Sequence, residues 1–148
     1  MENDGMDILK ALFYLTGLLG FIVGVWTYRA SLSLQRAKWL SELYDKFYHQ
    51  DRYHEMRKTL DYMQPDEIKH LSEALNSHSE NALEEEFVDY LNFFHFIAIL
   101  VESNQITHKE VNLMFSYYIS MLCKHDFIIN YMKKEGFNTL VNLVTELK

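Results

Sequence analysis

The feature that most constrains this chain is an uninterrupted run of eighteen uncharged residues, Ala11–Tyr28, near its N-terminus. A helix rises about 1.5 Å per residue, so the run spans roughly 27 Å, close to the ~30 Å hydrocarbon core of a bilayer. Aromatic side chains that favour membrane–water interfaces lie at its ends, Tyr14 at one and Trp26 and Tyr28 at the other. The run therefore predicts a single transmembrane helix with these three residues as interface anchors.

The flanks of the run predict which way it crosses. An acidic segment, MENDGMD, precedes it, and a basic collar of Arg29, Arg36 and Lys38 follows it. Because basic residues favour the cytoplasmic side, we expect residues 1–28 to form a short external N-terminus and the span, and residues 29–148 to form a cytoplasmic domain. A cleaved signal peptide is the competing interpretation, but it needs a basic leading region and a small-x-small cleavage site, and the sequence has neither.

Three of the five glycines of the chain lie inside the run, where leucine would suit a lipid-facing helix better. Thr16, Gly20 and Gly24 recur every fourth residue and share one helix face, which Gly17 widens. Small residues on one stripe, including this GxxxG, let helix backbones approach closely in lipid. We expect the stripe to join copies of the chain into a homo-oligomer surrounded by membrane lipid. The alternative is that glycine is simply commoner in membrane helices than in soluble ones.

The rest of the chain is typical of an all-α protein. It holds one proline and one cysteine, Cys123, so turn chemistry for a β-rich fold is scarce and no disulfide can form within the chain. Apolar residues recur at helical spacing in the segment WLSELYDKF, and no helix breaker separates this segment from the span. We expect the transmembrane helix to continue as one rod into a cytoplasmic bundle of about five to six helices.

Local signals divide the bundle into helices. Asp51 and Asp66 are the expected N-caps of two short helices, which end near Tyr62 and Leu75. The KHD sequence of residues 124–126 and the later Gly136 are expected to end two further helices before a final amphipathic one.

Two capping boxes are predicted between these short helices and the KHD sequence. Ser77 and Glu80 have the required spacing in a polar loop of residues 76–81, and Thr107 and Glu110 have it after a second turn. Each pair is expected to begin a helix.

The helix between the two capping boxes is apolar nearly all round from Phe87 to Val101, so it is expected to form the buried centre of the bundle. His95 lies within it, flanked by Phe94 and Phe96. A buried histidine that hydrogen-bonds a neighbour is the favoured interpretation over a metal ligand.

Charge is unevenly distributed within the total of −7. Residues 29–58 are basic, whereas residues 59–110 carry eleven acidic and two basic side chains. This acidic middle argues against a long nucleic-acid partner. It offers instead an acidic helical surface around Glu84–Asp89 for a cytoplasmic protein partner.

Known catalytic and cofactor motifs are absent from the sequence. The segment HEMRK has Lys58 where a zinc-protease motif needs its second histidine, and there is neither a phosphate-binding P-loop nor a GxGxxG. The R-x4–6-H signature of many helical ribonucleases is also missing. We expect no cofactor, no metal and no enzymatic activity.

The stretch FVDYLNFFHFIAILVESNQITHKEVNLMFSYYI, with the anchor and WLSELYDKFY, resembles small single-pass bacterial membrane proteins of unknown function with an aromatic-rich helical domain. This chain departs from their pattern at His95, where glutamate is expected, and at Asn104, where glycine is usual. In plan the chain is also similar to the membrane accessory proteins of type VI CRISPR loci, whose helical domains assemble into membrane pores.

These resemblances imply an inner-membrane protein of bacteria and an effector that perturbs or perforates that membrane in antiviral defence. The alternative is a membrane anchor or scaffold that recruits a cytoplasmic partner through the acidic surface.

Overall fold

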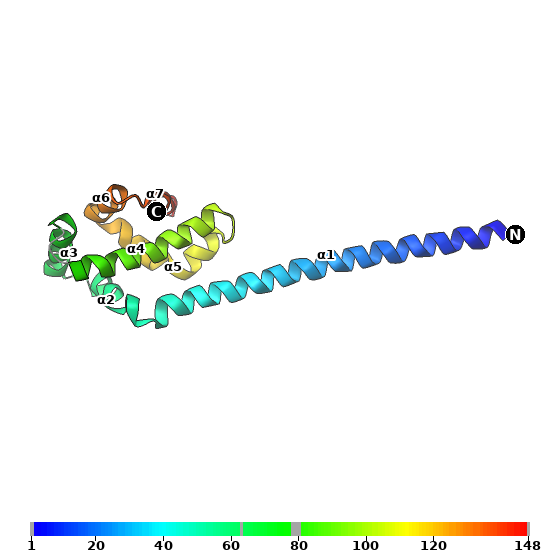
Figure 1. The fold of residues 1–148 in the computed structure, drawn as a ribbon, viewed down its shortest axis with the longest axis horizontal. Helices are drawn as coiled ribbons and strands as arrows, with labels where there is room; N and C mark the ends of the chain where they lie inside the picture. Colours follow the sequence, from blue (N-terminus) through cyan, green and yellow to red (C-terminus); the bar gives the residue numbers. More distant parts are fainter. Residues whose placement is uncertain (1, 63, 78–80, 148) are drawn as a thin grey trace. The chain divides into compact units, whose positions relative to one another are not determined.

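The computed structural model describes residues 2–62, 64–77 and 81–147, and all regular structure in these ranges is helical. The elements in chain order are α1 (Glu2–His49), a 3-10 turn η1 (Asp51–Tyr53), α2 (His54–Tyr62), α3 (Pro65–Ser77), α4 (Asn81–Glu102), α5 (His108–Lys124), α6 (Asp126–Lys134) and α7 (Asn138–Glu146) (Figure 1). The predicted all-α class is confirmed. The chain divides into two compact units, Met1–Glu42 and Leu43–Lys148.

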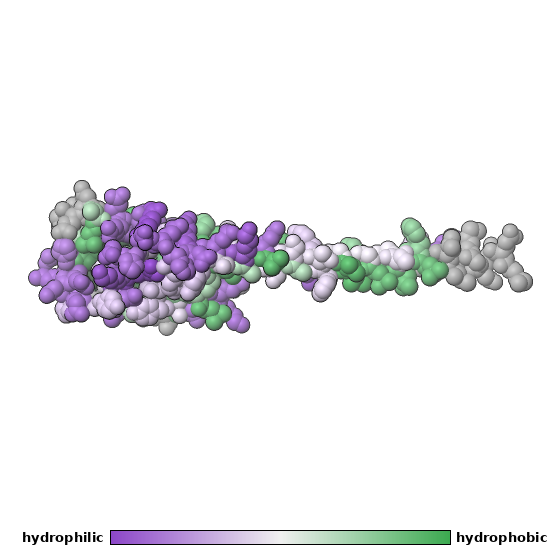
Figure 2. Space-filling view, turned by 90° about the horizontal axis from the view of Figure 1, so that it is seen from below, coloured by the Kyte–Doolittle hydropathy of each residue, from purple (hydrophilic) through white to green (hydrophobic). Residues whose placement is uncertain are grey.

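The first unit is a single helix, the greater part of α1. Within the described residues, α1 is the one helix long and apolar enough to cross a membrane, and its most apolar window is entirely unburied. Hydrophobic side chains gather along this part of α1 (Figure 2). No break separates it from the residues that follow, so the predicted continuous rod is confirmed.

The second unit begins in the last two turns of α1. Leu43 and Phe47 are buried, whereas residues 29–42 remain largely exposed. The predicted division after residue 28 marks the end of the apolar run. The compact unit begins later, at Leu43, because the basic segment between them does not pack into the core.

Helix α4 is the centre of the second unit, as predicted. It packs against α2, α3, η1 and α7. Its inward side chains are fully buried, among them Phe87, Tyr90 and Phe94. One stripe remains uncovered by the described residues, because Phe96 and Ile99 are 45% and 44% exposed.

The core of the second unit is aromatic and gathers around Phe47, which has no exposed surface. Edge-to-face and stacked arrangements at these separations add stability beyond burial alone. The ring centroid of Phe47 lies between 4.9 and 5.9 Å from those of Tyr48, Tyr53, Tyr90, Phe93, Phe94, Phe115 and Tyr118. The end of α1 is thereby fixed among residues of η1, α4 and α5.

Three of the predicted boundaries are built as the sequence indicated. The Thr107–Glu110 capping box is present: the Glu110 amide donates to Thr107 Oγ1 at 3.3 Å, and the Thr107 amide donates to Glu110 Oε2 at 2.7 Å. Gly136 follows the end of α6 with φ of +85°, a left-handed conformation that glycine adopts without strain. The KHD sequence separates α5 from α6, also as expected.

Two predicted N-caps are wrong. Asp51 lies inside η1, whose N-cap is Gln50, and α2 begins later, at His54. Asp66 lies in the first turn of α3 because Pro65 is already helical. A proline is tolerated at the first helical position, where its missing N–H would have no helical partner.

The predicted capping box at Ser77 is not the start of a helix. Ser77 is the last residue of α3, and its hydroxyl donates to the Glu73 carbonyl at 2.6 Å. Its expected partner, Glu80, lies outside the described residues.

Candidate functional site

The first candidate site is the small-residue face of α1. A helix turns about 100° per residue, so Thr16, Gly20 and Gly24 fall within roughly 80° of arc, with Gly17 at the edge. A Cβ added at any of these three glycines would meet no atom within 4 Å. Packing inside the chain therefore does not explain why glycine occupies these positions.

Two further residues, which sequence reasoning missed, extend this face. Thr27 follows Gly24 by three residues and Ser31 follows Thr27 by four, and this helical spacing was the available signal. The Thr27 hydroxyl donates to the Val23 carbonyl at 2.8 Å, and Thr16 makes the same kind of bond to the turn before it. Both hydroxyls are satisfied within the helix, so they can face lipid or a neighbouring helix without an unpaired donor.

The expected interface anchors and the basic collar lie on the same helix. Tyr14, Trp26 and Tyr28 are all exposed, as residues in contact with an interface must be. In the collar, Arg29 and Arg36 are two turns apart on one face, and Lys38 lies on the opposite face beside Glu42 at 3.8 Å. The helical geometry thus spreads the positive charge around α1.

The second candidate site is a polar cavity of about 340 Å³ in the second unit, which the sequence did not predict. Its walls come from α2 and α5, and its lining residues are His54, Arg57, Lys58, Asp61, Tyr62 and Tyr118. Four of these recur along α2 at spacings of three, one and three residues, a polar face that the sequence does contain. Tyr118 comes from a distant part of the chain, which only the fold brings near.

Arg57 is held firmly at this cavity. Its Cζ lies over the rings of Phe47 and Tyr48, at 5.3 and 5.5 Å from their centroids. Its Nη2 donates to the Tyr48 carbonyl at 3.0 Å, and its Nε donates to the Tyr53 carbonyl at 3.4 Å. Arg57 is half-buried as a residue, and aromatic faces and backbone oxygens hold its guanidinium.

Buried tyrosines surround the same region. Tyr90 is fully buried, and its hydroxyl has no hydrogen-bond partner in the part of the chain that the structure describes. Burial raises the pKa of Tyr90 well above its usual value, and Tyr118, Asp61 and Arg57 also act on it electrostatically. Burial likewise raises the pKa of Tyr118, with a further contribution from Asp61. The phenols therefore stay protonated, as hydrogen-bond donors, at neutral pH.

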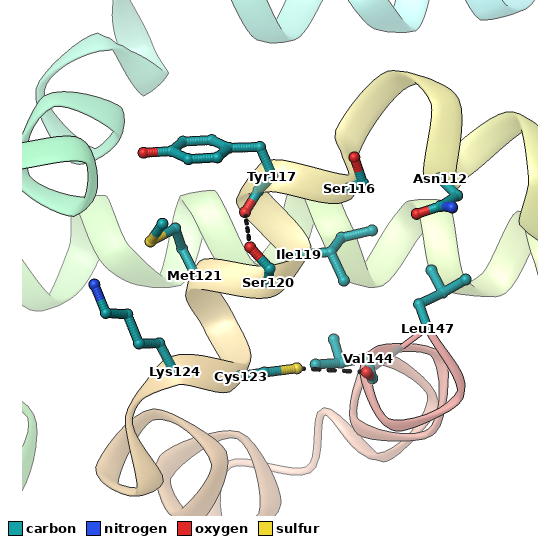
Figure 3. Close-up of a pocket in the computed structure, with 10 residues that line it drawn as sticks. All are labelled: Asn112, Ser116, Tyr117, Ile119, Ser120, Met121, Cys123, Lys124, Val144 and Leu147. Atoms are coloured by element: carbon teal, nitrogen blue, oxygen red, sulfur yellow. Dashed lines mark hydrogen bonds between the residues drawn. The ribbon is translucent and has the colours of Figure 1, made fainter.

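A larger cavity of about 830 Å³ lies between α5 and α7 (Figure 3). The thiol of Cys123 points from α5 toward α7 and donates to the Val144 carbonyl at 3.4 Å (Figure 3). Ser120 donates to the Tyr117 carbonyl within α5 at 2.6 Å. Both side chains donate to backbone carbonyls. The half-buried Cys123, which follows the apolar Met121 and Leu122, therefore has a structural role here.

His95 is half-buried, and its ring packs edge-to-face on Phe137 with centroids 5.4 Å apart. Its Nδ1 is buried and has no hydrogen-bond partner among the described residues, so the expected hydrogen bond is not found at that atom. The described residues also contain no group of three His, Cys, Asp or Glu side chains placed to hold a metal.

The predicted acidic surface on α4 is partly used inside the domain. Glu84 accepts a hydrogen bond from the Tyr131 hydroxyl at 2.8 Å, and Asp89 pairs with Arg52. Glu85 and Glu86 are exposed. Half of the four acidic side chains are thus already engaged and add less to a partner surface.

No protein-family model, curated protein or solved structure matches this chain. The two candidate sites, the small-residue face of α1 and the polar cavity beside α2, are therefore the features from which function is inferred.

Proposed function

We propose that the chain is a single-pass membrane protein whose copies associate through the small-residue face of α1. The observation that carries the proposal is that Gly17, Gly20 and Gly24 border open space in their own chain, on a segment with no buried side chain. In lipid, helices gain stability from close backbone contact because apolar burial alone gives no advantage. A second copy of α1 supplies the contact that these glycines permit.

The location we propose is the inner membrane of a bacterium, with the N-terminus outside and the second unit in the cytoplasm. The asymmetry of charge across the span supports this orientation, since Arg29, Arg36 and Lys38 all follow it. Association of the spans then brings several cytoplasmic domains together on one side of the membrane.

The assembly that we favour is an effector that perturbs or perforates the membrane in antiviral defence. The unbroken α1, fixed at Phe47 in the aromatic core, supports coupling between domain and span. A pore wall formed by this helix would present threonine, glycine and apolar side chains, which suits a gate that closes by dewetting. The second candidate function is a scaffold, which the exposed Glu85 and Glu86 favour as a docking surface.

The test is the mass of the intact protein in nanodiscs, compared with that of a Gly20→Leu/Gly24→Leu variant. We expect a closed assembly of several copies for the natural chain and a shift toward monomer for the variant, because leucine blocks close backbone approach. An Ile22→Leu/Val25→Leu variant, altered on the opposite face, is the control and should assemble normally. A glycine variant with unchanged mass would overturn the proposed interface.

Liposome leakage separates the two functions. An effector releases an encapsulated dye in proportion to its assembly, and the glycine variant releases less. A scaffold assembles without leakage and binds a cytoplasmic partner, which replacement of Glu85 and Glu86 by glutamine would weaken.

A further inference from the structure

We propose that the cavity beside α2 binds the phosphate group of a small phosphorylated ligand, with Arg57 and Lys58 as the anion-binding side chains. The proposal concerns the second unit alone and does not depend on self-association through the membrane. A ligand bound there would act on the second unit, in addition to the proposed contacts of α1 in the membrane.

The main evidence is the environment of Arg57. Arg57 is half-buried and has no carboxylate within 4 Å among the described residues, although its guanidinium is held by two aromatic rings and two carbonyls. A partly desolvated charge is costly unless an opposite charge accompanies it. Of the five N–H donors of an arginine, the two carbonyls occupy one on Nε and one on Nη2. The remaining donors are available to an anion that enters the cavity.

The other lining residues favour an anion over a cation. Three basic side chains and a single acidic one, Asp61, line the cavity. Lys58 and His54 approach Glu55 at 3.8 and 4.0 Å, but all three side chains are mostly exposed. Exposed ion pairs of this kind contribute little, so a phosphate held by Arg57 can recruit Lys58.

Phosphate fits this arrangement better than a halide or a simple carboxylate. Its several oxygens allow a bidentate contact with the fork of Arg57 and a separate contact with the point charge of Lys58. Tyr118 adds a phenol that stays protonated at neutral pH. The ring of Tyr62, which is 71% exposed, offers an apolar surface for the organic part of the ligand.

Two sources of ligand share this chemistry, a free phosphate monoester and the headgroup of phosphatidic acid. The test therefore uses the full chain in nanodiscs and has two arms. In the first, glycerol 3-phosphate is titrated by calorimetry at constant ionic strength into nanodiscs of phosphatidylcholine. In the second, phosphatidic acid replaces part of the lipid, and the thermal unfolding of the protein is followed.

Three variants make the test specific. Lys58→Gln changes an exposed side chain at the cavity and should weaken binding about five- to tenfold, with the fold intact. Lys69→Gln is the matched control, because Lys69 forms a similar exposed pair with Glu73 on α3 and should bind as the natural chain does. Arg57→Lys keeps the charge but loses the fork, so it should weaken binding more than tenfold; near-UV circular dichroism checks its packing.

A saturable response in either arm that Lys58→Gln reduces and Lys69→Gln leaves unchanged supports the proposal, and the responding arm identifies the source. The proposal is overturned by the absence of a response in both arms up to about 20 mM glycerol 3-phosphate, a concentration that would reveal even millimolar affinity. Equal responses of Lys58→Gln and Lys69→Gln also overturn it, since the response would then reflect charge in general.

Discussion

Two phenylalanines of α1 show how differently the two units use apolar residues. Phe13, in the first unit, is 76% exposed, and Phe47, in the second, has no exposed surface. In water, exposing one such side chain costs about 2 kcal/mol, and the first unit exposes a whole run of them. The second unit stabilises its residues by packing within the chain, whereas the apolar window of the first has no buried side chain. Under the proposed function, lipid and other copies of the helix would supply the contacts that the first unit lacks.

The largest expected effect comes from removing Phe47. Phe47→Ala takes away a ring surrounded by seven others and should lower the free energy of unfolding of the second unit by about 3–5 kcal/mol. Denaturant unfolding of the full chain in mild detergent, followed by near-UV circular dichroism, measures this loss. Phe13→Ala is the matched control and should leave the midpoint unchanged. Equal effects of the two substitutions would show that the units are not independent in their packing.

A smaller effect, of opposite sign, is expected at Tyr90. Tyr90→Phe keeps the ring and removes a buried hydroxyl that has no partner among the described residues, so it should stabilise the domain by about 1 kcal/mol. Denaturation at pH 7 measures this gain, and a loss of stability would reveal a hydrogen bond at that hydroxyl.

The same tyrosine predicts a pH dependence. Because burial raises the pKa of Tyr90 in the folded state, the unfolded chain loses this proton first, so the free energy of unfolding is constant below the unfolded pKa near 10 and falls as the pH rises beyond it. Burial also raises the pKa of Tyr48, Tyr53 and Tyr118. Unfolding midpoints measured from pH 8 upward should therefore fall above about pH 10, and less steeply in Tyr90→Phe. A flat profile would contradict the assigned burial.

A local effect, no larger than that at Tyr90, is expected at a helix cap. Thr107→Ala removes the hydroxyl that accepts from the Glu110 amide in the capping box of α5. It should lower the free energy of unfolding by about 1 kcal/mol. Thr107→Ser keeps the oxygen and serves as the control in the same denaturation experiment. If alanine and serine behave alike, the hydroxyl does not support the helix.

Features of the fold that depend on residues close together in the sequence could be predicted from it. The rod, the central α4 and the Thr107–Glu110 box each follow from periodicity or spacing within a few turns. The caps at Asp51 and Asp66 were misplaced because several positions nearby are equally able to begin a helix, and tertiary packing selects one.

The polar cavity could not be predicted because it is assembled across the chain. Arg57 comes from α2 and Tyr118 from α5, and no local pattern links them. The role of Phe47 was equally hidden, since only the fold brings Phe93 and Phe115 to its ring.

The most direct test of the central claim is a cysteine cross-linking scan of the span in membranes. With Cys123→Ser as background, single cysteines are placed from residue 15 to residue 28, and disulfide-linked dimers are quantified after oxidation. Association through the small-residue face predicts maxima at positions 20, 24 and 27 and minima at 18, 22 and 25, a helical period of about 3.6 residues. A flat profile, or maxima on the opposite face, would contradict it.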